Sequence, residues 1–90
     1  MRILIYDDDP NACFMLRELL HKESFAQGNE ILIATCLQQA EVHIKKGIDI
    51  LFQDIELTNN ENGIRFAKDM KSANPELYVV FITAHIKYCE

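Results

Sequence analysis

The stretch Ile48-Asp49-Ile50-Leu51-Phe52-Gln53-Asp54 is a short, nearly continuous apolar run that ends on a carboxylate. A run of this length that is apolar on both faces is typical of a strand buried between layers of helix, as in a parallel sheet. In such sheets, ligands bind beyond the carboxyl ends of the strands. The pattern therefore predicts that Asp54 lies at the ligand-binding edge of a parallel sheet.

Polar groups also follow two other strand-like runs. They are residues 2–6, followed by Asp7, Asp8 and Asp9, and residues 77–82, followed by Thr83. Since the carboxyl ends of parallel strands meet at one edge of a sheet, we expect these carboxylates and this hydroxyl to lie near Asp54.

Helical patterns separate the predicted strands. Asp9 and Pro10 have the form of an N-cap followed by proline at the first helical position. The three helices are predicted to end near Phe25, at Gly47 and at Asn74-Pro75. The positions expected to face the sheet are Cys13, Leu16 and Leu20 in the first helix, Leu37, Ala40 and Ile44 in the second, and Ile64, Ala67 and Met70 in the third.

The chain thus alternates between strands and helices. A further strand is predicted over Ile31 to Thr35, and His85 to Glu90 has the pattern of another helix opening. Strands that alternate with helices imply an α/β fold, a doubly wound parallel sheet with helices on both faces. No repeat or linker interrupts residues 1–90, so we expect one domain.

Composition excludes several classes of function. The net charge is -5, and no basic stripe is present, which argues against direct nucleic-acid binding by this segment. No apolar run is long enough to span a membrane, so a cytoplasmic protein is expected. The cysteines and histidines are scattered without the paired spacing of a metal site, which favours reduced thiols.

The acids at the strand ends predict a metal site. Asp7 and Asp8 are adjacent, and bringing Asp54 close to them would raise at least one carboxyl pKa unless a cation were bound. Mg²⁺ prefers carboxylate and carbonyl oxygens and commonly bridges them to a phosphoryl group. With such a metal present, Asp54 could act as a nucleophile that accepts a phosphoryl group, and the Thr83 hydroxyl could bind a phosphoryl oxygen.

Four pieces of the sequence, in this order and spacing, form a joint pattern. They are Ile3-Leu4-Ile5-Tyr6-Asp7-Asp8-Asp9-Pro10, Leu51-Phe52-Gln53-Asp54-Ile55-Glu56-Leu57, Asn62-Gly63-Ile64 and Phe81-Ile82-Thr83-Ala84-His85. This joint pattern resembles the receiver domain of two-component response regulators. The long loop before Asn62 and the later His85-Ile86-Lys87-Tyr88 resemble the LytTR branch, and within it the accessory-gene-regulator type of regulator.

This resemblance implies a role for each matching residue. Asp54 corresponds to the phosphoacceptor, which a sensor histidine kinase would phosphorylate. Asp7 and Asp8 correspond to the acid pair that holds Mg²⁺, Asp8 directly and Asp7 through water. Glu56 would add its backbone carbonyl to the metal. Thr83 corresponds to the switch hydroxyl, with Ala84 at the access route to the site.

The resemblance also implies a fold and a partner. The sheet would be flavodoxin-like, with strand order 2-1-3-4, and the fifth strand and last helix of the family would lie beyond residue 90. The family's lysine and switch aromatic belong to that strand. We therefore expect a truncated receiver whose Asp54 is phosphorylated only slowly by small phosphodonors. The parent protein would carry a DNA-binding output domain for transcriptional regulation. The domain is expected to be a signalling module rather than an enzyme.

Two features depart from the family pattern. Gln53 is polar where family members usually carry an apolar residue. Without a fifth strand, residues 77–82 would form an exposed edge, which favours self-association through that strand or through His85 to Glu90.

Two alternatives remain open from the sequence. One is a pseudo-receiver used only for protein contacts. The other is a phosphatase of the haloacid-dehalogenase type, which would use Asp7 and Asp9 on the first strand. Asn11 stands where that family has threonine or valine, and the chain lacks room for a substrate cap.

Overall fold

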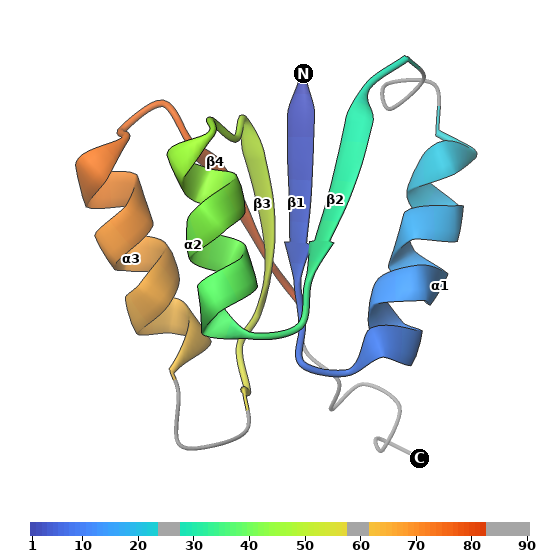
Figure 1. Cartoon of the computed structure of the whole chain (residues 1–90), viewed down its shortest axis with the longest axis horizontal. Helices are drawn as coiled ribbons and strands as arrows, with labels where there is room; N and C mark the ends of the chain where they lie inside the picture. Colours follow the sequence, from blue (N-terminus) through green and yellow to red (C-terminus); the bar gives the residue numbers. More distant parts are fainter. Residues whose placement is uncertain (24–27, 58–61, 83–90) are drawn as a thin grey trace.

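Four parallel strands form the sheet, in the order β2-β1-β3-β4. The computed structural model of the chain describes residues 1–23, 28–57 and 62–82 (Figure 1). Its elements are β1 (Arg2–Tyr6), α1 (Pro10–His21), β2 (Glu30–Ala34), α2 (Leu37–Lys45), β3 (Ile50–Asp54), α3 (Gly63–Ala73) and β4 (Tyr78–Ile82). The predicted α/β fold and the strand order 2-1-3-4 are confirmed.

The strand register brings the carboxyl ends of β1 and β3 level with each other. Tyr6 lies opposite Gln53 in the pairing of β1 with β3. The residues that follow, Asp7 and Asp54, therefore leave the sheet side by side. On the other side of β3, Asp54 lies opposite Ile82, the last described residue of β4.

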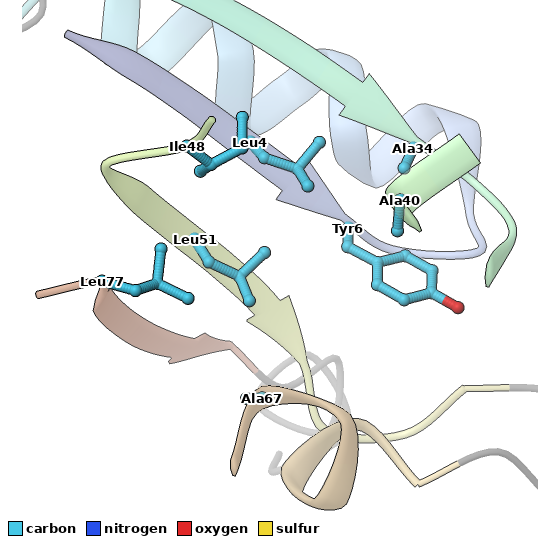
Figure 2. Close-up of a cluster of buried hydrophobic side chains, with 8 residues drawn as sticks. All are labelled: Leu4, Tyr6, Ala34, Ala40, Ile48, Leu51, Ala67 and Leu77. Carbon is cyan, nitrogen blue, oxygen red and sulfur yellow. The ribbon is translucent and has the colours of Figure 1, made fainter. Parts of the chain in front are cut away.

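The core consists of two layers, one on each face of the sheet. Successive side chains of a strand point to opposite faces, so β1 supplies residues to both layers. One layer lies under α2 and α3 and consists of Leu4, Tyr6, Ala34, Ala40, Ile48, Leu51, Ala67 and Leu77 (Figure 2). The other layer lies under α1 and consists of Ile3, Ile5, Cys13 and Leu20. The strands β1 and β3 are thus covered on both faces, as their apolar runs predicted.

Side-chain caps determine where the helices begin. The Asp9 carboxylate accepts a hydrogen bond from the Asn11 amide at 3.0 Å, and Pro10 follows it as the first residue of α1. The Asn62 side chain caps α3 by accepting from the amides of Ile64 and Arg65, at 2.9 and 3.1 Å. The predicted N-cap at Asp9 is confirmed.

Two details of the helices were predicted wrongly. α1 ends at His21 rather than near Phe25, because the amides of Lys22 and Glu23 bond to carbonyls three residues back and tighten the last turn. In α3, Ile64 is 38% exposed instead of facing the sheet. Phe66 faces the sheet and packs edge-on against Tyr6, with ring centroids 5.2 Å apart.

The described residues contain no helix that is long and apolar enough to cross a bilayer. The helix predicted to open at His85 lies outside the described residues.

Candidate functional site

Three carboxylates meet at the carboxyl edge of the sheet. Asp7 and Asp8 follow β1, and Asp54 is the last residue of β3. One carboxylate oxygen from each of these three residues lies within 4.8 Å of the others. The structure therefore brings together the three acids that the sequence placed at one edge.

Backbone contacts hold Asp7 in place. Its amide donates to the Ala34 carbonyl at 3.1 Å, which continues the pairing of β1 with β2 by one residue. Its carboxylate accepts from the Asp9 amide at 2.9 Å, and its carbonyl accepts from the Cys13 thiol at 3.2 Å. Asp7 is only 5% exposed, so its side chain has little freedom to move away from Asp54.

Asp54 is held in a similar way from β3 and β4. It is 3% exposed, and its carboxylate accepts a hydrogen bond from the Glu56 amide at 3.2 Å. The next amide, of Ile55, donates to the Ile82 carbonyl at 3.0 Å. The turn at Ile55 and Glu56 thus holds the Asp54 carboxylate at the carboxyl end of the sheet.

The electrostatics of the cluster disfavour three negative charges. Burial raises the pKa of Asp54 to about 6, with the charge of Asp7 as the next largest cause, and the Glu56 amide only partly opposes this. Burial also raises the pKa of Asp7, opposed by the Asp9 amide and reinforced by the charge of Asp8. Without a cation, the site therefore holds a proton more tightly than isolated aspartates do.

The three acids fit a hard divalent cation. With Mg–O bonds of about 2.1 Å in an octahedron, oxygens lie about 3.0 Å apart when they are adjacent and about 4.2 Å apart when they are opposite. The carboxylate oxygens, which lie within 4.8 Å of one another, therefore need to close by at most about 1.8 Å, a distance that side-chain rotation covers. The donors are all oxygens, and the raised pKa values of Asp7 and Asp54 come first from burial and then from the neighbouring negative charges, which a bound cation would offset.

The loop after Asp54 returns directly to the site. Glu56 and Asn62 form an isolated antiparallel bridge, and the Gly63 amide donates to the Ile55 carbonyl at 3.3 Å. A Cβ at residue 63 would overlap the Asp54 carbonyl oxygen and lie 2.9 Å from its carbonyl carbon. Glycine at this position therefore allows α3 to begin in contact with the end of β3.

Two residues beside the site had no predicted role there. Cys13 was predicted only as part of the inner face of α1, yet its thiol donates to Asp7. Burial raises the pKa of this thiol to about 11, so it stays a protonated donor. Gln53 donates from Nε2 to the Asp54 carbonyl at 3.0 Å. Its polarity inside an apolar strand was the sequence signal, but nothing in the sequence showed its partner.

Two predicted site residues cannot be compared with the structure. Thr83, the predicted switch hydroxyl, and Ala84 lie outside the described residues. Glu56 was predicted to provide its backbone carbonyl as a metal ligand. Its backbone lies next to the acids, because its amide donates a hydrogen bond to the Asp54 carboxylate.

A hollow of about 470 Å³ also lies between α3 and β4, lined mainly by apolar side chains such as Ile64, Ala67, Val79 and Phe81. None of the three acids lines it. The hollow is therefore separate from the acid cluster.

A parallel sheet of order 2-1-3-4 with an acid cluster at its carboxyl edge is the architecture of the receiver class of signalling domains. The family model for the response regulator receiver domain matches residues 3–89. The chain therefore belongs to the response regulator receiver domain family. No match is found among curated protein sequences.

Solved structures agree with this assignment. The chain is 28% identical to the response regulator TrrA of Thermotoga maritima, solved in complex with Mg²⁺ and BeF, with a TM-score of 0.77 over 98% of this chain and 73% of that one. It is 30% identical to the N-terminal domain of a response regulator/sensory box/GGDEF protein of Carboxydothermus hydrogenoformans, with a TM-score of 0.77 over 94% and 66%.

A third structure shares the fold at lower identity. The signal receiver domain of a DNA-binding response regulator from Colwellia psychrerythraea is 23% identical, with a TM-score of 0.81 over 92% of this chain and 68% of that one.

Proposed function

We propose that this receiver domain accepts a phosphoryl group on Asp54 from a sensor histidine kinase and passes the resulting change to an output domain. The observation that carries this proposal is the convergence of the Asp7, Asp8 and Asp54 carboxylates within 4.8 Å at the carboxyl edge of the sheet. Membership of the receiver family supports the same role.

The chemistry assigned to Asp54 is nucleophilic. One carboxylate oxygen attacks the phosphorus of the donor, the bond from phosphorus to the donor's leaving group breaks, and an acyl phosphate forms on Asp54. The Glu56 amide, 3.2 Å from Oδ1, holds the carboxylate in one orientation for this attack. The first residue of α3 packs against the Asp54 backbone and limits its movement.

Mg²⁺ is the cofactor that these residues fit. Asp7, Asp8, Asp54 and the Glu56 carbonyl would hold it, and it would neutralise charge on the transferring phosphoryl oxygens. The bonds that Asp7 makes to the Asp9 amide and the Ala34 carbonyl keep the acid pair in position before the metal binds. One neighbour in the fold was solved with Mg²⁺ and BeF, which supports this choice of cation.

The finer proposals rest on the sequence resemblance. They are membership of the LytTR branch, a DNA-binding output domain for transcriptional regulation, a cytoplasmic location and a switch hydroxyl on Thr83. In this proposal the domain modifies itself and acts as a signalling module rather than an enzyme.

Small phosphodonors test the assignment of the phosphoacceptor. We expect acetyl phosphate with Mg²⁺ to give an acid-stable, hydroxylamine-sensitive label on Asp54, detected by mass spectrometry. Asp54→Asn should lose this label, while Asp69→Asn, which neutralises an exposed carboxylate on α3, should keep it. A label that persists in Asp54→Asn would refute the assignment. Labelling of the 90-residue chain is expected to be slow, so Mg²⁺ binding without any label would favour a receiver used only for protein contacts if a full-length version also stayed unlabelled.

Metal binding gives a second prediction. Asp8→Asn should weaken Mg²⁺ binding on the order of tenfold, because it removes one of three charged oxygen donors. Isothermal titration calorimetry would measure the affinity, with Asp69→Asn as the control. Equal affinity in Asp8→Asn and the parent chain would contradict a role for Asp8 as a ligand.

A third prediction concerns self-association of the 90-residue chain. β4 lies at the edge of the described sheet, and its Tyr78 and Phe81 side chains are 65% and 45% exposed. Apolar edge strands pair readily with other chains. We therefore expect dimers or larger species in sedimentation equilibrium at tens of micromolar, roughly the scale of modest apolar contacts. A folded monomer at that concentration would contradict this prediction.

A further inference from the structure

Gln53 is a polar side chain buried in the layer between the sheet and α3. It is 0% exposed. Because strand residues alternate between faces, Gln53 points to the same face as Leu51, which belongs to the layer under α2 and α3. Its Oε1 is buried and has no hydrogen-bond partner among the described residues. A buried amide with one orphaned oxygen fills this space less favourably than an apolar side chain of the same length would.

The other end of the amide makes a specific contact. Nε2 donates to the Asp54 carbonyl at 3.0 Å and lies 3.1 Å from the point where a Cβ of Gly63 would be. The side-chain amide of Gln53 therefore lies between the end of β3 and the first residue of α3. Gln53 and Gly63 both lie against the Asp54 carbonyl and restrict how it can turn.

The Asp54 carbonyl belongs to the peptide unit that joins Asp54 to Ile55 at the end of β3. The amide of the same unit, that of Ile55, donates to the Ile82 carbonyl at 3.0 Å. The peptide unit is planar, so hydrogen bonds to its carbonyl and from its amide together fix its orientation. This orientation sets the direction in which the chain continues to Glu56. The Glu56 amide then reaches the Asp54 carboxylate at 3.2 Å.

We propose that Gln53 is a positioning residue for the phosphoacceptor segment, residues 54–56. By binding the Asp54 carbonyl it sets the Asp54–Ile55 peptide plane, and this plane places the amide and carbonyl of Glu56 relative to the Asp54 carboxylate. The consequence for Mg²⁺ and phosphoryl transfer rests on the proposed function. The positioning itself belongs to the metal-free protein and can be measured there.

Gln53→Met tests this role, because methionine keeps the length of the side chain and removes the donor. Amide hydrogen exchange in the metal-free protein should be about tenfold faster at Ile55 and Glu56, since the local opening that exposes them becomes easier. The amide of Leu4, in the central strand β1, should be unaffected. Mg²⁺ affinity should fall by roughly tenfold, as happens when the partner of a metal ligand is removed.

Gln38→Met is the matched control, because it makes the same change at an exposed position of α2. Gln53→Leu repeats the test with a second apolar side chain. Unchanged exchange at Ile55 and Glu56 in the Gln53 variants would overturn the proposal, as would an equal loss of protection at Leu4. A parent chain that binds no Mg²⁺ would count against the proposed function, while the exchange result would still decide the role of Gln53.

Discussion

Gly63→Ala is expected to destabilise the domain by about 2–3 kcal/mol, the cost of forcing an extra methyl group into a closely packed site. The added Cβ would overlap the Asp54 carbonyl oxygen, which is backbone and cannot rotate away as a side chain could. Either α3 must move outward or the Asp54 peptide must turn. Helix propensity alone predicts the opposite sign, because alanine is favoured over glycine by about 1 kcal/mol inside a helix.

The same substitution should also damage the site. A turn of the Asp54 peptide would displace the Glu56 amide from the Asp54 carboxylate, so Mg²⁺ affinity should fall on the order of tenfold. Urea denaturation and calorimetric titration would measure the two effects on the same variant.

Gly47→Ala provides the matched control for Gly63→Ala. Gly47 has a φ of 100° and open space where a Cβ would be, so its replacement strains only the backbone. It should cost about 1–2 kcal/mol, the penalty for a non-glycine residue in the left-handed region. Its Mg²⁺ affinity should equal that of the parent chain. A Gly63→Ala protein as stable as the parent, with unchanged affinity, would show that α3 does not depend on contact with β3.

The fold could be predicted from the sequence because the apolar runs and helix caps that define it depend on residues close together in the chain. The apolar runs of β1 and β3 predicted strands covered on both faces, and the structure buries Leu4, Ile5 and Leu51 completely. The side chain of Asp9 has its hydrogen-bond partner two residues away, so its role as a cap could be predicted.

The errors came from contacts between elements. Ile64 was placed on the inner face of α3 by its spacing from Ala67, but the rotation of α3 depends on how closely Gly63 approaches Asp54. That approach buries Gly63 and Ala67 and leaves Ile64 half-exposed. The end of α1 likewise depends on where the chain must turn toward β2.

The sequence predicted which acids lie together at the ends of the strands, but not the contacts that orient them. Parallel pairing brings Asp7 and Asp54 together whatever their neighbours are. The contacts that orient them could not be predicted, because a sequence does not show that the Gln53 amide bonds to the Asp54 carbonyl. Such contacts depend on side-chain rotamers and on distances of a few tenths of an ångström.

Without metal, the domain should become less stable as the pH rises from 5 to 7.5, apart from the titration of other groups. The pKa of Asp54 is raised from 3.8 to about 6 in the folded protein. The folded state therefore binds the proton on Asp54 more tightly than the unfolded state does. The stabilisation that this proton gives is complete below pH 3.8 and is lost as the pH rises through 6. Asp7, whose pKa is also raised, acts in the same direction.

Asp54→Asn separates this effect from every other titration. The amide is neutral and similar in shape, so it should stabilise the metal-free protein at pH 7.5 by about 2–3 kcal/mol, which is the free-energy equivalent of the shift from 3.8 to about 6. At pH 4 the parent carboxyl is protonated in the folded state, so most of this advantage should disappear. The effects of Asp54 and Asp7 will not simply add, because the two carboxyls interact.

Urea denaturation in EDTA at pH 4, 5, 6 and 7.5 would measure the stability difference between Asp54→Asn and the parent chain. Asp69→Asn, which changes an exposed carboxylate, should track the parent at every pH. With saturating Mg²⁺ this advantage of Asp54→Asn should shrink at pH 7.5, since the cation binds the parent with its ionised acids more tightly than it binds the variant. A difference between Asp54→Asn and the parent that stays constant across this pH range would contradict the raised pKa of Asp54, because the carboxyl would then ionise as easily in the folded domain as in the unfolded chain.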